Sequence, residues 1–314
     1  MSALRVFLSR IALGLFSAWA VLTTVFAVFT LSDDWRQRAI EGPMRFASAS
    51  EAEIEAAVEE YIQERGFDRP ITEQYVDYMW SMFTLDWGTS FETGEPVTAE
   101  IAGSVTRTAM YVLPAIALGI VLGMGIGLYA ALNPSSRLAN LTRGTAYLLF
   151  ALPSFWLGGV LVGLVQGGVI DRPDLLFDHG LPIFLTTMTL LGGYVSYSRA
   201  HAMEYTGTAF VSLLRAKGAS PILVTKHLVR NAAIPLVSML FTEVLALLVL
   251  AVFVIEFLFG IGGFGMLFFG AVRFRDVPLV LGGTMVIIVL GVVGNIIQDL
   301  SYNYLDPRVD TGRR

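Results

Sequence analysis

The sequence lacks several features on which common catalytic and metal sites depend. It contains no cysteine, so disulfides and thiolate metal sites are excluded. Its histidines are scattered and form no spaced ligand pair, and no metal site is predicted at His179, His201 or His227. The phosphate-binding pattern G-x-x-x-x-G-K-[ST] is absent, as are G-x-S-x-G and H-E-x-x-H. We therefore predict that this chain is not an enzyme and does not hydrolyse a nucleotide through a P-loop.

Charged residues are also few. They make up 15% of the 314 residues, whereas 55% are hydrophobic and the mean hydropathy is +0.66. A water-soluble domain of this length carries more charge, and this balance is typical of a protein with several membrane spans.

Six apolar segments are predicted to cross the membrane as helices. The first, Ile11–Leu31, is an uncharged run that would be about 31 Å long as a helix. It is too long for the apolar part of a secretory signal, so an uncleaved span is expected. The predicted fold class is an all-α polytopic membrane protein with spans at Ile11–Leu31, Thr108–Leu132, Gly144–Val165, Leu181–Ser198, Leu236–Leu258 and Pro278–Ile297.

Arginine and lysine are unequally distributed between the predicted loops. Over the short loops and chain ends, twelve lie on one side of the membrane and three on the other. Since short cytoplasmic loops carry an excess of these residues, we predict a cell (inner) membrane protein with both termini in the cytoplasm. The predicted domains are an N-terminal segment with the first span (1–31), an external acidic helical cap (32–107) and a five-helix core (108–314).

The predicted cap, 32–107, holds 16 acidic residues against six arginines. Ser50 and Glu53 form an S-x-x-E capping box that predicts the start of a helix, and Gly66 is placed to end it. A second amphipathic helix is predicted at Ile71–Phe83. The cap is thus expected to be a folded unit on the membrane surface, with residues of the interfacial aromatic belt at Tyr75, Trp80 and Trp87.

The stretch 213–235 is a polar island between two apolar runs, and it contains both lysines of the chain, Lys217 and Lys226. Gly218 and Pro221 interrupt a first short helix, after which the spacing of apolar residues predicts a second, amphipathic helix that ends near residue 235. One hypothesis is an ordinary positive-inside anchor. The other is a docking surface for a cytoplasmic partner.

Five short motifs carry a resemblance to a known family. They read GTSFETGEPV (88–97), LPSFWLGG (152–159), LLRAKGASPILVTKHLVRNAAIP (213–235), VIEFLFGIGGFG (254–265) and DPRVD (306–310). In their order the chain resembles the membrane subunits of binding-protein-dependent ABC importers, specifically the dipeptide/oligopeptide/nickel permease family. The likeness covers the first span and runs from about residue 66 to the end.

The resemblance implies a role for the stretch 213–235, which we call the docking stretch. In the family this loop docks an ATPase, which implies contact residues at Arg215, Ala216, Lys217, Gly218, Lys226, Arg230, Asn231 and Pro235. Structural roles are implied for Gly88, Pro153, Glu256, Gly263, Gly265, Asp299, Asp306 and Pro307. The implied partners are a homologous second permease, two cytoplasmic ATPase subunits that bind ATP and Mg, an external solute-binding protein and membrane lipid. No cofactor in this chain and no nucleic acid is expected.

The chain also departs from the family. The docking loop of ABC importers usually begins with Glu-Ala-Ala, where this chain has Ser212, Leu213 and Leu214. A Pro-Gly pair is usual in the external turn, where this chain has Gly262 and Gly263. The first departure leaves the ATPase contact open at that end of the docking stretch.

Two further positions have competing interpretations. Glu243 lies within the predicted fifth span, where it either lines the transport path or is satisfied by a neighbouring helix. Gly119, Gly123 and Gly127 recur every four residues and predict a helix-packing face more readily than a transport role.

The function expected is that of a permease subunit of an ATP-driven importer for peptides or a related small solute. Nickel, glutathione and oligosaccharides remain alternative cargoes. A stand-alone secondary transporter or channel is the first rival, and a membrane-anchored sensor is the second.

Overall fold

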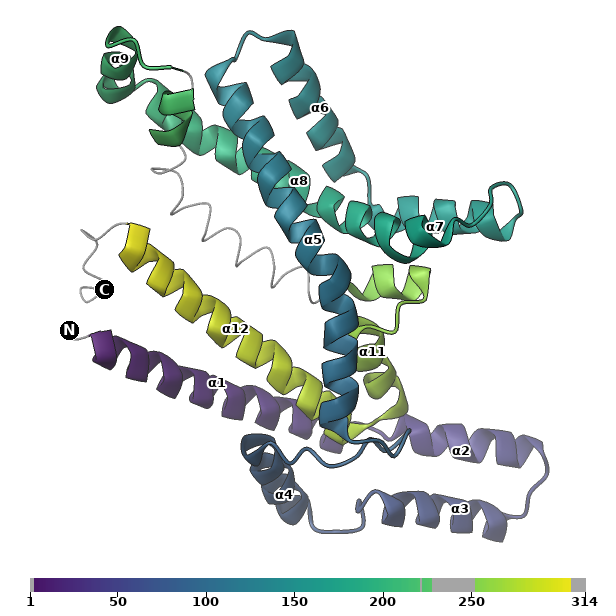
Figure 1. The fold of residues 1–314 in the computed structure, drawn as a ribbon. Helices are drawn as coiled ribbons and strands as arrows, with labels where there is room; N and C mark the ends of the chain where they lie inside the picture. The colour runs from purple at the N-terminus through teal and green to yellow at the C-terminus, as the bar shows by residue number, and fades with distance from the viewer. Residues whose placement is uncertain (1–2, 221, 228–251, 306–314) are drawn as a thin grey trace. The chain divides into compact units, whose positions relative to one another are not determined.

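The structure is a computed structural model that describes residues 3–220, 222–227 and 252–305. Within this part of the chain it is helical and contains no strand, apart from an isolated bridge between Thr89 and Pro96 (Figure 1). A further helical segment covers 222–227. The elements are α1 (Ala3–Leu31), α2 (Trp35–Phe46), α3 (Glu51–Glu64), α4 (Ile71–Thr84), α5 (Val97–Leu132), α6 (Arg137–Ala151), α7 (Ser154–Gln166), the π-helical turn η1 (Leu176–Gly180), α8 (Leu181–Thr206), α9 (Ala209–Ala216), α11 (Phe264–Phe274) and α12 (Val277–Leu305).

The chain forms two compact units. Unit 1 contains Met1–Ser104 and Leu267–Val293, and unit 2 contains Val105–Met266 and Gly294–Arg314. These units are groups of residues in contact and do not test the three predicted domains, which stay a prediction.

The all-α polytopic class is confirmed. Three helices in the described part of the chain are long and apolar enough to cross a membrane, within Leu8–Phe46, Val97–Leu132 and Val277–Gln298. They correspond to the predicted first, second and sixth spans. Two pairs of bent helices raise the number to as many as five. Most of the predicted fifth span lies outside the described residues, so the number six remains a prediction.

The predicted third span, Gly144–Val165, is not one continuous helix. It is divided between α6 and α7, whose axes differ by 77°. Pro153 has no backbone N–H to donate, and it holds the preceding Leu152 in an extended conformation, with φ −78° and ψ 123°. The loop predicted at 133–143 is also too long, because α6 already begins at Arg137 after the N-cap Ser136.

The second bent pair shows that the interval 259–277, which the sequence predicts as a Gly-rich external loop between the fifth and sixth spans, is not a loop throughout. The helix Val252–Phe259 ends there, but α11 then follows at 92° to it. The irregular backbone is limited to the glycine-containing segment 260–263 and to Arg275 and Asp276 between α11 and α12. From Phe264 the sequence is largely apolar and forms a helix, which the sequence interpretation missed.

The cap helices around the capping box are confirmed. Ser50 accepts a hydrogen bond from the Glu53 backbone, and the Glu53 carboxylate accepts one from the Ser50 N–H, at the start of α3. Gly66 follows α3 with φ +64°, and the Phe67 N–H donates to the Ile62 carbonyl.

The cap region differs from the prediction in one additional helix and in one helix start. Helix α2 was not predicted, and it lies beside α3 (Figure 1). Its N-cap is Asp34, which accepts hydrogen bonds from the backbone N–H groups of Arg36 and Gln37. Helix α5 begins at Val97, directly after Pro96, and not at Thr108. Its first turns are polar, which hid them from a search for apolar runs.

Helix α8 is the central helix of unit 2, since it packs against α6, α7 and α9 and also contacts α5. It contains the predicted fourth span but is not among the helices long and apolar enough to be recognised as spans. Its many threonine, serine and tyrosine residues lower its hydropathy, and two of the hydroxyls are buried against α5. Thr187 donates to the Ala115 carbonyl of α5 at 3.4 Å, and Ser198 donates to the Gly123 carbonyl at 3.2 Å.

The predicted glycine packing face on α5 is confirmed. A Cβ atom on Gly119 would lie 3.2 Å from the Leu190 side chain. One on Gly127 would lie 2.7 Å from the carbonyl oxygen of Val195. The backbones of α5 and α8 approach closely because these positions carry no side chain.

Candidate functional site

The docking stretch is built as a short helix, a tight turn and a second helical segment. Helix α9 ends at Ala216, Gly218 has φ +77°, and the Ala219 N–H donates to the Leu214 carbonyl at 3.0 Å. This is the hydrogen bond of a Schellman motif, which requires a left-handed residue where Gly218 stands. Ser220 then caps the segment 222–227 through its hydroxyl and carbonyl oxygens.

Two valines fix this turn to the helices of unit 2. Val211 of α9 and Val224 of the following segment are 1% and 3% exposed. They form a buried cluster with Leu128 and Ala131 at the end of α5 and with Ala202 of α8. The turn at Gly218 is therefore packed against the ends of α5 and α8.

The outer face of the same turn is exposed and mixed in character. Ala216, Lys217, Gly218 and Lys226 are all exposed, and no atom lies within 4 Å of a Cβ placed on Gly218. Apolar side chains are exposed beside them, at Phe210, Leu213, Leu223 and Ile222, the last 82% exposed. These apolar positions were not predicted as contact residues. The sequence indicated only that Ile222 and Leu223 belong to the apolar pattern of the second predicted helix.

Several predicted site residues cannot be placed. Arg230, Asn231, Pro235, Glu243, Asp306 and Pro307 lie outside the described residues. The backbones of Arg215 in α9 and Asp299 in α12 are described, but their side chains are not. Their predicted roles stay predictions.

The structure brings three family-matching residues, Glu256, Gly263 and Gly265, together in one elbow of unit 2. The Glu256 carboxylate is fully buried and accepts hydrogen bonds from the hydroxyls of Thr108 at 2.6 Å and Tyr111 at 3.2 Å, and from the Met266 N–H at 2.9 Å. A carboxylate in this position needs such donors, because burial without them is costly.

The glycines of this elbow leave room for that carboxylate. A Cβ atom on Gly263 would collide with the Glu256 carboxylate and would lie 2.6 Å from the Thr108 hydroxyl. One on Gly265 would lie 2.8 Å from the Phe253 Cα. Glycine at these positions thus follows from close approach, and the geometry fits the structural role expected for Glu256.

The motif at 88–97 forms a closed turn in unit 1. Gly88 has φ +69°, and its carbonyl accepts from the Val97 N–H at 3.0 Å. Within the turn, Ser90 donates to the buried carboxylate of Asp276 at 2.6 Å. Asp276 also accepts from the Leu279 N–H at 3.2 Å, so it caps the start of α12 while holding the turn.

Sequence reasoning missed a second polar centre of unit 1, which is formed by Arg275. This residue has φ +54°. Its guanidinium donates to the backbone carbonyls of Phe29 and Asp33 and forms an ion pair with Asp34. It therefore covers the C-terminal carbonyls of α1 and holds the N-cap residue of α2. No sequence signal available to us distinguishes Arg275 from Arg273, because the partners are more than 200 residues away in the chain.

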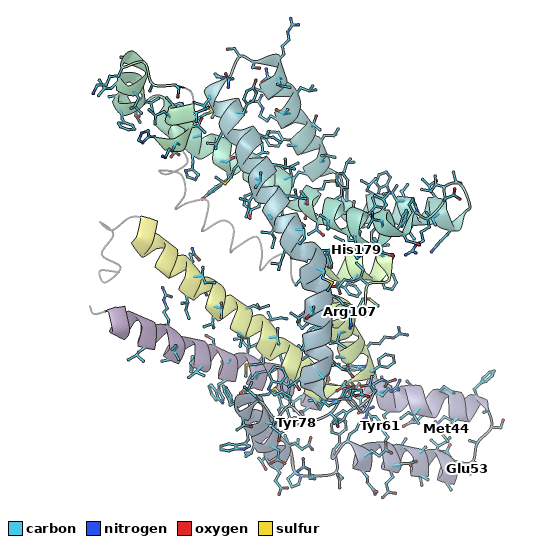
Figure 2. All side chains as sticks on the ribbon, viewed as in Figure 1. Met44, Glu53, Tyr61, Tyr78, Arg107 and His179 are labelled. Carbon is cyan, nitrogen blue, oxygen red and sulfur yellow. The ribbon has the colours of Figure 1, made fainter. Side chains whose placement is uncertain are left out.

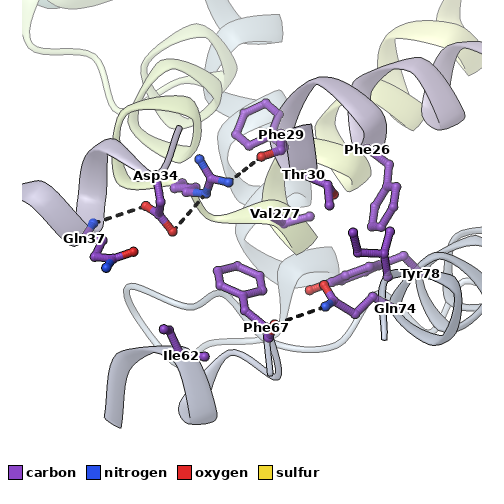
Figure 3. Close-up of a pocket in the computed structure, with 12 residues that line it drawn as sticks. Phe26, Phe29, Thr30, Asp34, Gln37, Ile62, Phe67, Gln74, Tyr78 and Val277 are labelled. Atoms are coloured by element: carbon purple, nitrogen blue, oxygen red, sulfur yellow. Dashed lines mark hydrogen bonds and ion pairs between the residues drawn. The ribbon is translucent and has the colours of Figure 1, made fainter. Parts of the chain in front are cut away.

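A cavity of about 250 Å³ lies beside this centre, lined mostly by aromatic and polar side chains, with residues from α1, α2, α3 and α4 (Figure 3). Tyr61 of α3, seen in Figure 2, donates to Asp34 at 3.0 Å. Burial raises the pKa of Tyr61 to about 12, and the negative charge of Asp34 acts in the same direction. Tyr61 therefore remains a neutral donor throughout the physiological pH range.

Trp87 departs from the prediction, because it is not an exposed belt residue. It is 9% exposed, and a Cβ on Gly282 of α12 would lie 2.9 Å from its ring.

Among the residues that the structure describes, no group of three or more His, Asp or Glu side chains could hold a metal ion.

The fold and these sites define a multi-pass, all-α membrane protein. Residues 119–311, more than half of the chain, match the family described as binding-protein-dependent transport system inner membrane component. The chain belongs to this family, which contains the permease subunits of ABC importers.

Individual relatives agree with the family. The chain is 28% identical over 268 residues to the oligopeptide transport system permease protein AppB of Bacillus subtilis, covering 80% of this chain and 84% of AppB. It is 29% identical over 322 residues to a putative peptide permease protein of Brucella suis, covering 98% and 99%. It is 26% identical over 256 residues to the metal-staphylopine import system permease protein CntB of Staphylococcus aureus, covering 79% and 81%.

Proposed function

We propose that this chain is the transmembrane subunit of an ATP-driven importer that translocates peptides or related small solutes delivered by an external binding protein. A homologous second permease would complete the path. Two cytoplasmic ATPase subunits would bind ATP and Mg, so this chain itself would carry no catalytic residue. The similarity to AppB, named as an oligopeptide permease, and to the Brucella suis relative, named as a putative peptide permease, supports the choice of cargo class.

The geometry of the docking stretch is the observation that carries this proposal. A simple positive-inside anchor needs charge but no defined shape. Here the turn is capped on both sides of Gly218 and fixed by two buried valines, while its other face exposes lysines and large apolar residues. Exposed apolar side chains with basic neighbours are suited to a protein partner.

This arrangement also suggests how ATPase motion would reach the membrane. Because Val211 and Val224 pack against α5 and α8, the docking stretch would move with these helices as a rigid body. Closing of the ATPases on ATP would then change the packing of the spans and open the path outward, and hydrolysis would reset it. Tight packing favours such a transfer over local deformation.

Substitutions at Gly218 test the proposal in the reconstituted complex. Gly218→Val should leave the chain inserted and abundant but abolish binding-protein-stimulated ATP hydrolysis and uptake together, because a β-branched residue is strained at φ +77°. Gly218→Asn is the matched control, since asparagine tolerates the left-handed conformation. Activity retained in the asparagine variant would assign the effect to backbone conformation, and its loss would assign it to contact with the ATPase.

A surface substitution tests the contact itself. Ile222 is 82% exposed, so Ile222→Asp should not disturb folding. Stimulated hydrolysis should fall about tenfold or more if Ile222 meets the ATPase. Normal stimulation in both Gly218→Val and Ile222→Asp would exclude the docking role. ATP-independent uptake by the lone chain in liposomes would instead favour the stand-alone transporter and contradict the importer proposal.

A metal chelate is the second candidate cargo. The similarity to CntB, whose name describes metal-staphylopine import, is the observation that favours it. Uptake of a labelled peptide and of a labelled metal chelate by the same reconstituted complex, each with its binding protein, would distinguish the two.

A further inference from the structure

Helix α4 of unit 1 has apolar side chains on two faces from its middle to its end. One face is covered by protein, as Met79 and Met82 are 8% and 0% exposed. The other carries Val76, Trp80 and Phe83, which are 61%, 72% and 41% exposed. These three lie at helical spacing i, i+4 and i+7 and form one strip, which we call the exposed stripe.

The charged residues of α4 lie in its first half, and its second half carries none. The acidic residues Glu73 and Asp77 lie in the first two turns, and Asp77 pairs with Arg69 at 2.6 Å. From Tyr78 to Leu85 there is no charged residue. An uncharged helical segment with apolar side chains on its covered and its exposed face is suited to an environment without water. Its two aliphatic hydroxyls, on Ser81 and Thr84, donate to backbone carbonyls of the same helix.

Helix α4 is attached to the membrane-spanning helix α1. The Tyr75 hydroxyl accepts a hydrogen bond from the Trp19 indole N–H at 2.9 Å and lies 2.9 Å from the Thr23 hydroxyl. Further along α4, Met82 and Phe83 line an apolar groove together with Leu15 and Ala18 of α1. The second half of α4 therefore runs along α1, away from the end at Leu31.

The depth of these contacts follows from the length of α1. Its 29 residues give a helix about 43 Å long, which exceeds a hydrocarbon core of about 30 Å by about 13 Å. Ala18 lies about 20 Å from the Leu31 end along the axis. Even if the whole excess projected at that end, the level of Ala18 would still be about 7 Å inside the hydrocarbon.

We infer that the second half of α4 is inserted into the bilayer leaflet in which α1 ends, and that lipid acyl chains cover the exposed stripe at Trp80 and Phe83. The first half, with Glu73 and Asp77, remains at the headgroup level. The cap is then anchored by a helix that enters the membrane without crossing it. This goes beyond a cap resting on the surface, and it holds whichever side of the membrane that leaflet faces.

Spin labels on single cysteines test this, because the chain has no native cysteine. Val76→Cys, Trp80→Cys and Phe83→Cys would be labelled in the full-length chain in phospholipid vesicles. Collisions with oxygen, which concentrates in lipid, and with a nickel chelate, which stays in water, would be measured. The exposed Leu13→Cys on α1 provides the lipid reference, and Glu55→Cys on α3 the aqueous reference.

The inference expects the labels at Trp80 and Phe83 to resemble Leu13, with an oxygen-to-nickel collision ratio severalfold above that at Glu55. The label at Val76, beside Asp77 at the headgroup level, should give a ratio between the two references. Nickel collisions at Trp80 as frequent as at Glu55 would place the stripe in water and overturn it. Low collision rates with both reagents would also overturn it, since they would show that another protein segment covers the stripe. Three separate positions guard against disturbance by a single label.

Discussion

Asp34 and Arg275 form an ion pair with 3.4 Å between the carboxylate Oδ2 and the guanidinium Nε. Asp34 is the N-cap residue of α2, the first helix of the predicted cap, and Arg275 lies between α11 and α12. Within unit 1, this one contact therefore joins the start of the cap to a segment from the second half of the chain. Arg275 is 6% exposed and stands in a left-handed conformation that usually favours glycine. Its side-chain contacts therefore outweigh a backbone cost at this position.

Substituting Arg275 should separate these two contributions. Arg275→Ala removes the ion pair and the caps on α1 and should destabilise unit 1 by about 3 kcal/mol. Arg275→Gly removes the same contacts but relieves the backbone, so it should be less destabilising than alanine by about 1 kcal/mol. Thermal unfolding of the purified chain would measure both. Equal stability of wild type and Arg275→Ala would contradict the role given to the side chain.

The packing of α5 on α8 has a built-in control. Gly127→Ala would place a methyl group against backbone atoms of Val195 and Arg199 and should cost about 1–3 kcal/mol. Gly125 lies two residues away on the same helix with no atom within 4 Å of its Cβ position. Gly125→Ala should thus be neutral or slightly stabilising. A lower unfolding midpoint for both variants alike would argue against a packing face specific to Gly127.

The elbow around Glu256 makes a prediction for Thr108. Its hydroxyl donates to the Glu256 carboxylate and accepts from the Phe264 N–H at 2.8 Å. Thr108→Val keeps the shape but leaves both groups without this partner and should cost about 1–3 kcal/mol. Thr108→Ser keeps the hydroxyl and should stay close to wild type. The unfolding midpoints of the two variants in lipid nanodiscs provide the comparison, and a valine variant as stable as the serine one would contradict it.

Features specified by neighbouring residues were predictable from the sequence. The start of α3 depends on Ser50 and Glu53, three positions apart, and its end on Gly66. The packing face of α5 follows from a four-residue glycine repeat. In each case the residues that determine the structure are close in the chain, so a short pattern contains the whole physical cause.

Features that depend on distant contacts were not predictable. The bend at Pro153 falls inside an apolar run, where hydropathy alone indicates one continuous span. The importance of Arg275 comes from backbone carbonyls at and just after the end of α1, and that of Asp276 from the turn at Ser90. In the docking stretch, the sequence identified Gly218 and the lysines but not the exposed apolar side chains, because exposure depends on which face Val211 and Val224 bury.

The capping box of α3 predicts a pH dependence. The Ser50 backbone N–H and then its hydroxyl hold the pKa of Glu53 below the ordinary value of 4.5. A group with a lowered folded pKa stabilises the helix above its unfolded pKa, and this stabilisation is lost as the pH falls through the lowered value. Hydrogen-exchange protection in the first turn of α3 should therefore decrease at pH ~3 relative to pH ~7.

Two variants test the origin of that effect. Glu53→Gln can still accept from the Ser50 backbone but does not titrate, so its protection should not change over this pH range beyond the intrinsic exchange rate. Ser50→Ala should lower helix stability by about 1 kcal/mol at neutral pH through loss of the N-cap. A pH response in Glu53→Gln equal to that of wild type would assign the effect to other acidic residues of the cap.

The membrane orientation rests on the distribution of arginine and lysine between short loops, and cysteine labelling tests it directly. The native chain has no cysteine, so Ser50→Cys and Ser220→Cys each provide a single reactive site. Ser50 is exposed ahead of α3 and Ser220 is exposed in the docking stretch. In intact cells, a membrane-impermeant maleimide should label Ser50→Cys, whereas Ser220→Cys should react only after the cytoplasmic face is opened. Labelling of both from outside, with a cytoplasmic marker protein left unlabelled, would show that the cap and the docking stretch share one side and would exclude the ATPase-docking role.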